Sequence, residues 1–85
     1  MTRAQELRKE VLLQLYGAQR LSLSTAQILR EARRGGIEDA TKEEIGNTLF
    51  FLKGLGFATL VEDAASGEVR YQITSAGILQ HERAD

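Results

Sequence analysis

In residues 41–57 the chain reads Thr41-Lys-Glu-Glu-Ile-Gly-Asn-Thr-Leu-Phe-Phe-Leu-Lys-Gly-Leu-Gly-Phe57, and this stretch decides the fold. Its first four residues form a capping-box pattern, in which a Thr hydroxyl and a Glu three residues later satisfy N–H groups at a helix start. Gly56 ends the pattern, because glycine readily adopts the left-handed conformation that terminates many helices. We therefore expect a helix over residues 42–55. Its buried stripe is predicted to be Ile45, Leu49, Leu52 and Leu55.

A β-hairpin is predicted directly after this helix, over residues 57–73. Apolar and polar residues alternate in its two halves, which is the period of a half-buried strand. The halves are separated by Ala64-Ala65-Ser66-Gly67, which supplies the small residues of a tight turn. Thr74 then caps a last helix, expected over residues 75–81, with Ile78 and Leu79 available to the core.

A short strand and a second helix are predicted before residue 41. The alternation in Leu21-Ser-Leu-Ser24 predicts a strand over residues 21–24 that pairs beside the hairpin. A second capping box, Ser24-Thr-Ala-Gln27, predicts a helix over residues 25–34, which Gly35-Gly36 ends. Ile37, in the turn that follows, is expected to reach the core.

The first predicted helix, over residues 3–18, carries more apolar residues than its core face needs. Its core face follows helical spacing through Ala4, Leu7, Val11, Leu15 and Ala18. Further apolar residues lie off this face, which is unusual for the surface helix of a monomer. We interpret this second face as covered partly by the last helix and partly by a second copy of the chain. A homodimer is therefore predicted, with interface residues Leu12, Leu13, Tyr16 and Leu79.

The order helix, strand, helix, helix, hairpin, helix resembles the winged helix-turn-helix superfamily over almost the whole chain. Leu52-Lys-Gly-Leu-Gly-Phe57 is similar to the end of the recognition helix and the start of the wing in that superfamily. Tyr71-Gln-Ile-Thr-Ser-Ala-Gly77 is similar to the end of the wing in bacterial regulators of the MarR and PadR type. The resemblance implies one α+β domain over residues 1–85, with a three-helix core, a hairpin wing and a short terminal helix. A weaker likeness, to small winged-helix proteins of Mu-like prophages, implies a phage setting.

In this superfamily the third helix normally lies in the DNA major groove, so the resemblance implies a small DNA-binding protein and a transcriptional regulator. A helical projection places Glu43, Asn47, Phe50 and Gly54 opposite the buried stripe. Asn pairs bidentately with adenine and Glu accepts a hydrogen bond from cytosine N4, whereas basic residues and helix N-termini contact phosphate. The predicted DNA-binding residues are Arg33, Arg34, Thr41, Lys42, Glu43, Asn47, Phe50 and Arg70.

Each of these residues also has a purely structural interpretation. Asn47 suits a solvated helix face, Glu44 a capping box, and the arginines near residue 34 the negative end of a helix dipole. The predicted wing is acidic, since it carries Glu62, Asp63 and Glu68. Phe50 and Phe51 suit a thymine methyl, a protein interface or the core. The alternative function is therefore a protein–protein interaction module with little or no DNA binding, contacting its partner through Phe50 and Phe51.

The charge and the composition limit the other function classes. The net charge is −1, which argues against avid coating of nucleic acid. Residues 1–42 carry eight Lys/Arg against five Asp/Glu, and residues 43–85 carry three against seven. The positive charge of the first half could face a polyanion, or the charges could simply form an ordinary mixed surface. No apolar run approaches the ~20 residues of a membrane span, and no signal peptide is evident, so a cytoplasmic location is expected.

Catalysis is not expected. The chain has no cysteine, and His81 is its only histidine, so a nucleophilic dyad or a zinc site lacks its other members. Gly35-Gly36 is not followed by the Gly-Lys-Ser/Thr of a phosphate-binding loop. No enzyme activity, cofactor or metal is predicted.

Overall fold

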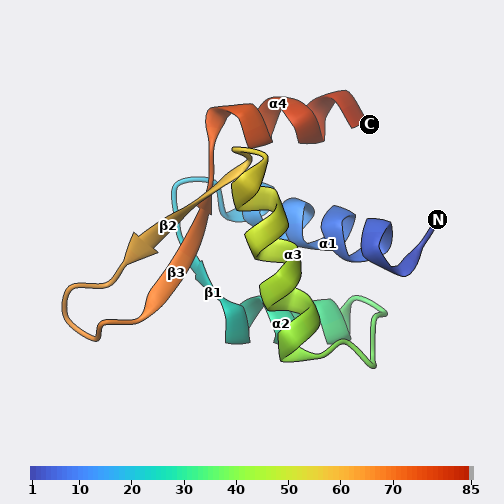
Figure 1. The fold of residues 1–85 in the computed structure, drawn as a ribbon, viewed down its shortest axis with the longest axis horizontal. Coiled ribbons are helices and arrows are strands. Elements are labelled where there is room, and N and C mark those ends of the chain that lie inside the picture. Colours follow the sequence, from blue (N-terminus) through green and yellow to red (C-terminus); the bar gives the residue numbers. More distant parts are fainter. Residues whose placement is uncertain (85) are drawn as a thin grey trace.

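The computed structural model describes residues 1–84, which form four helices and a three-stranded antiparallel sheet. The elements follow in the order α1 (Arg3–Ala18), β1 (Leu23–Ser24), α2 (Thr25–Arg34), α3 (Lys42–Gly54), β2 (Ala58–Glu62), β3 (Val69–Ile73) and α4 (Ser75–Ala84). In Figure 1 the hairpin of β2 and β3 extends to one side of the helices, and α3 crosses in front of α1. The architecture is α+β and is that of a winged helix-turn-helix domain.

Three of the four helices begin with a complete capping box. Besides the two found in the sequence, at Ser24 and Thr41, a third box at Thr2 starts α1. In each box the N-cap hydroxyl accepts a hydrogen bond at 3.2 Å from the third helical N–H. An N-cap of this kind contributes about 1 kcal/mol to helix stability. The starting points of these helices are thus fixed by local sequence.

The sheet has the strand order β1-β3-β2, so the short first strand pairs beside the hairpin. Leu23 and Leu60 both lie opposite Tyr71, which produces an apolar row across the three strands. The first strand is shorter than the predicted 21–24, because Leu21 donates its N–H to the Ala18 carbonyl in a turn and its side chain is exposed.

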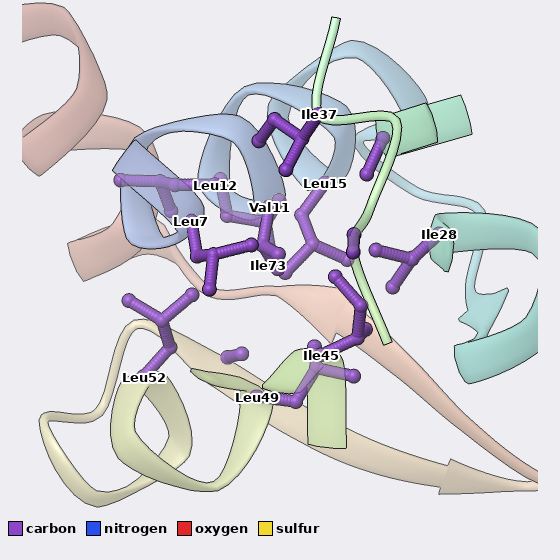
Figure 2. Packing of buried hydrophobic residues seen from close by; sticks show 13 residues of the cluster. Leu7, Val11, Leu12, Leu15, Ile28, Ile37, Ile45, Leu49, Leu52 and Ile73 are labelled. Carbon is purple, nitrogen blue, oxygen red and sulfur yellow. The ribbon is translucent and has the colours of Figure 1, made fainter. Parts of the chain in front are cut away.

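The core lies between α1, α2, α3 and the sheet. Figure 2 shows the α1 side chains facing those of α3, with Ile73 of β3 beside them. Ile37 is buried, so the turn before α3 does reach the core. The largest fully buried side chains are Val11, Leu15, Ile28, Ile45 and Leu49.

One prediction for the buried stripe of α3 was wrong. Leu55 is 51% exposed, because α3 ends at Gly54 and the next turn carries this side chain out of the stripe. Thr48 is buried instead, although it is polar. Its hydroxyl donates to the Glu44 carbonyl at 2.8 Å, so burial leaves no unsatisfied group. The apolar period alone did not reveal this position.

The two motifs that carry the family resemblance contact each other. The Thr74 hydroxyl donates to the Gly56 carbonyl at 2.6 Å, and the Thr74 N–H donates to the Phe57 carbonyl at 3.1 Å. The same hydroxyl accepts from the Gly77 N–H at 3.0 Å, which starts α4. A Cβ atom at Gly77 would collide with the Phe57 carbonyl and with Ile73. Glycine is therefore required here by close backbone approach.

The last helix is longer than predicted and leaves one apolar residue in solvent. α4 continues to Ala84, beyond the expected end at residue 81. Ile78 packs against the core, whereas Leu79 is 52% exposed. The rings of Tyr16 and His81 stack with their centroids 4.3 Å apart, and this contact helps to hold α4 on α1.

We expect Gly77→Ala to destabilise the fold by about 1–3 kcal/mol, which is the usual cost of overpacking a tight contact. Urea unfolding followed by circular dichroism measures this. Gly46→Ala is the matched control, because nothing lies within 4 Å of a Cβ in that helical position. It should stabilise α3 by roughly 0.5–1 kcal/mol, since alanine is the better helix former. Equal effects of the two variants would contradict the close-approach argument.

Candidate nucleic-acid interface

The outward face of α3 is the candidate site. Glu43, Asn47, Phe50 and Gly54 are all exposed or partly exposed, opposite the buried stripe of Ile45, Leu49 and Leu52. Asn47 forms no side-chain hydrogen bond with the described residues, so its amide can donate and accept elsewhere. Figure 1 shows this helix at the front of the helical body, with the hairpin extending to one side. A continuous strip of accessible groups thus runs along α3.

The N-terminus of α3 already holds carboxylates. Glu44 accepts the Thr41 N–H at 3.1 Å, and Thr41 in turn accepts the Glu44 N–H. Arg3 binds Glu44 through Nε at 3.0 Å and also forms an ion pair with Asp39 at 3.0 Å. Glu44 therefore acts in the capping box of α3, as the sequence pattern Thr41-Lys-Glu-Glu44 indicated. Its carboxylate occupies part of the positive helix end that a phosphate would use.

The pKa of Glu44 is held below its ordinary value, first by the hydrogen bond from Arg3 and then by those from Thr41. These donors favour the ionised carboxylate. Arg3 thereby connects the first turn of α1 to the first turn of α3.

The two predicted arginines of α2 have intramolecular partners but remain at the surface. Arg33 donates through Nε to the Ala40 carbonyl at 2.9 Å, which braces the loop between α2 and α3. Arg34 pairs with Glu31 at 3.2 Å, and its side chain is 74% exposed. Arg30 is also exposed and lies one turn earlier on the same face. The sequence analysis missed Arg30, although its spacing from residues 33 and 34 was visible.

Arg70 is a structural clamp, which corrects its prediction as a phosphate contact. Its guanidinium donates to the Ser22 carbonyl at 2.8 Å, to the Ser22 hydroxyl at 3.0 Å and to Gln27 Oε1 at 3.1 Å. It also forms an ion pair with Glu68 at 3.3 Å. These bonds use its donors to join β3 to the start of α2. Nothing in the local sequence around residue 70 indicates contacts 43 and 48 residues away.

Part of the acidity of the wing serves its turn. Asp63 accepts the Ala65 N–H at 2.9 Å, and Ser66 accepts the Glu68 N–H at 3.1 Å. The pKa of Asp63 is lowered chiefly by the hydrogen bond from the Ala65 backbone. The Asp63 carboxylate therefore stabilises the turn of the wing.

Two lysines flank the outward face of α3. Lys42 and Lys53 are eleven residues apart, close to three helical turns, so they lie on the same side of the helix. Both are exposed. Lys53 was missed by the sequence analysis, which treated it only as part of the motif that ends the helix.

Phe50 and Phe51 point to different surroundings. Phe50 is 74% exposed on the outward face of α3. Phe51 is 39% exposed on the flank toward α1, where the Arg8 guanidinium lies 3.7 Å from its ring centroid. The two rings therefore do not form one common contact surface.

The predicted dimer residues fall into two groups. Leu12 is buried within the chain at 8% exposure, and Tyr16 packs against the core and donates its hydroxyl to Glu82 at 3.2 Å. Their off-face position is thus explained by α4 and the flank of α3, which corrects their assignment to a partner surface. Leu13 and Leu79 are about half exposed, so they are the two of the four that a partner can reach.

No group of three or more His, Cys, Asp or Glu side chains suitable for a metal ion occurs in residues 1–84. Within the same residues, no helix has the length and apolar character needed to cross a membrane.

We expect Arg3→Ala to raise the pKa of Glu44 toward its ordinary value of 4.5. Because the folded-state pKa is the lower one, the pair stabilises the fold at neutral pH, and this contribution disappears as the pH falls through the folded-state pKa. Wild type and variant should therefore differ in urea stability at neutral pH and converge once the pH lies below the folded-state pKa of Glu44. An NMR titration of the Glu44 carboxyl measures the shift, with Arg34→Ala as control. An unchanged Glu44 titration in Arg3→Ala would contradict this.

The fold is shared with solved structures of MepR from S. aureus. The MepR–DNA complex matches at a TM-score of 0.79 and 20% identity, covering 99% of this chain and 61% of that one. A single-residue mutant of MepR from a multidrug-resistant clinical isolate matches at 0.76 and 20% identity, covering 91% and 52%. The chain thus spans little more than half of their length. No family model and no curated protein matches the sequence. The comparisons establish the winged helix-turn-helix fold that the motifs predicted.

Proposed function

We propose that this protein binds duplex DNA through α3 and acts as a transcriptional regulator. The observation that carries the proposal is the outward face of α3, which no other described element covers and which offers a side-chain amide with two lysines along one edge. MepR, which shares this fold, has been solved with DNA, and this likeness supports the proposal. The cytoplasmic location predicted from the sequence accompanies this proposal.

Asn47 is the proposed base-reading residue. It lies at the middle of the accessible strip, and its amide can pair with the N6 and N7 atoms of adenine. Glu43 lies one turn earlier and suits cytosine N4, whereas Phe50 suits a thymine methyl. These three positions are separated by about one turn each, which is how a recognition helix addresses successive bases.

Phosphate contacts are proposed for the basic groups around this strip. Lys42 and Lys53 flank α3, and Arg33 and Arg34 lie at the end of α2 with Arg30 beside them. Thr41 offers only the helix N-terminus, which Glu44 already shares. Arg70 contributes by positioning the wing rather than by contacting phosphate. Few cations are available, so the DNA-binding constant should depend only weakly on salt concentration. The slope of its logarithm against the logarithm of the salt concentration is about −0.9 for each neutralised phosphate.

We expect duplexes selected from a random pool at low salt to bind wild-type protein more tightly than unselected duplexes. Asn47→Ala should lose roughly 1–3 kcal/mol on the selected sites, because one bidentate base contact is removed, and little on unselected DNA. Fluorescence anisotropy measures both. Gln80→Ala, an exposed amide on α4, is the matched control and should bind like wild type. Absence of enrichment at low salt would sink the DNA-binding proposal.

Protein contact through Phe50 is the alternative function, favoured by the 74% exposure of this ring and by the acidic wing. The prophage setting gains no support from the fold or from the comparisons and stays a prediction from the sequence.

A homodimer is proposed with the DNA-binding function, since two copies of α3 would read a palindromic site. Leu13 and Leu79 are its remaining contact residues. Leu79→Glu should shift the protein toward the monomer in sedimentation equilibrium, because a charge would be buried in the interface. Leu60→Glu is the matched control, a similarly exposed leucine on the wing. A wild-type chain that stays monomeric at high concentration would remove the dimer.

A further inference from the structure

A groove of about 650 Å³ lies on the flank of the molecule, between α1, the end of α3 and α4. Its apolar lining comes mainly from Leu12, Phe51, Leu55 and Phe57. Two of these side chains remain substantially exposed, Phe51 at 39% and Leu55 at 51%. An apolar patch that is rimmed by polar groups marks an interaction site more often than a bare surface does.

The rim of this groove is cationic. Arg8 and Lys9 line it, and no Asp or Glu among residues 1–84 does, in a chain that has more acidic than basic residues overall. Neither cation forms an ion pair with a described carboxylate, in contrast to Arg3, Arg34 and Arg70. Within the described residues, the groove therefore lacks the negative charge that would complement it.

The stacking of Arg8 shows where a carboxylate would bind. Its guanidinium carbon lies over the Phe51 ring, 3.7 Å from the ring centroid, so the ring covers one side of the cation. Stacking of this kind leaves the N–H edge of the guanidinium available for a bidentate carboxylate. The same residue pair thus presents an apolar floor and an oriented anion-binding edge.

We propose that this groove binds an amphipathic helix of another protein, with apolar side chains seated over Phe51 and Leu55 and Asp or Glu residues beside Arg8 and Lys9. Helix-in-groove recognition uses this combination of an apolar channel and a charged rim. The groove is open along its length, whereas a pocket for a small molecule usually buries most of its ligand. A helix therefore suits this groove better than a small molecule does.

The groove is separate from the proposed DNA face. Phe51 lies on the flank of α3 toward α1, about 100° around the helix from Phe50, and Leu55 follows directly after the end of the helix. A helix in the groove and DNA on the outward face can therefore bind at the same time. The proposal does not rest on DNA binding and remains testable if that function fails.

The probes are two displayed libraries of 16-residue peptides that share Leu or Phe at helical spacing. One library carries Glu at the flanking positions and the other carries Lys. We expect ligands only from the acidic library, and their amide shift changes in NMR should centre on Phe51, Leu55 and Gln80. Lys9→Glu should weaken them about tenfold through charge repulsion at the rim, while a peptide with the facing Glu changed to Lys should recover binding.

Lys42→Glu is the matched control, since it reverses an exposed lysine outside the groove and should leave peptide binding unchanged. Lys9→Glu should conversely leave the DNA affinity unchanged. The proposal is overturned if the acidic library yields no ligand, if the basic library yields equal ones, or if Lys9→Glu has no effect on the selected peptides. Benzoate that shifts the same amides when no peptide binds would identify a small-acid site instead and would equally overturn it.

Discussion

The hydrogen bond from the Thr74 hydroxyl to the Gly56 carbonyl, 2.6 Å long, is the contact on which the arrangement of the domain depends. It joins the end of the wing to the turn that follows α3, and the Gly77 N–H completes the junction from the other side. Because the backbones approach so closely, no side chain fits at residue 77. The direction of the wing, the start of α4 and one wall of the flank groove all follow from this junction.

The distribution of the basic residues between framework and surface shapes the chemistry of the molecule. Arg3 connects two helices through carboxylates, and Arg70 connects the wing to α2. Arginine suits these tasks because its planar fork binds several acceptors at once. The cations of α3 itself are lysines, which act as mobile point charges beside its outward face. The proposed DNA binding would therefore depend more on the few groups of one helix than on a broad electrostatic field.

The local signals in the sequence predicted the helices and the hairpin because they depend on neighbours in the chain. The capping boxes at Ser24 and Thr41 place two helix starts, and the helical period identified the accessible strip that contains Asn47. Arg70 and Leu12 were misassigned because their partners lie far away in the sequence. Periodicity shows that a side chain leaves the main core face, but not which distant element covers it. The family resemblance supplied the order of the elements, and it did not supply these contacts.

The same limit applies to the candidate site. The accessibility of Asn47 follows from its place on α3, whereas the loss of Arg70 as a phosphate contact follows from a tertiary bond. Leu55 was misplaced by the end of a helix, where a one-residue difference turns a side chain from the core to solvent. The surroundings of residues at the ends of helices, and of residues that bond to distant parts of the chain, are thus known only from the structure.

Gln27 Oε1 couples the wing to the start of α2. This atom accepts the Ser24 N–H at 2.9 Å to complete the cap of α2, and it also accepts Arg70 of β3 at 3.1 Å. Ser24 is at once the last residue of β1 and the cap of the helix, so no flexible joint separates them. A bend of the hairpin would therefore also displace the first turn of α2, because β3 and the cap of that helix share one acceptor atom.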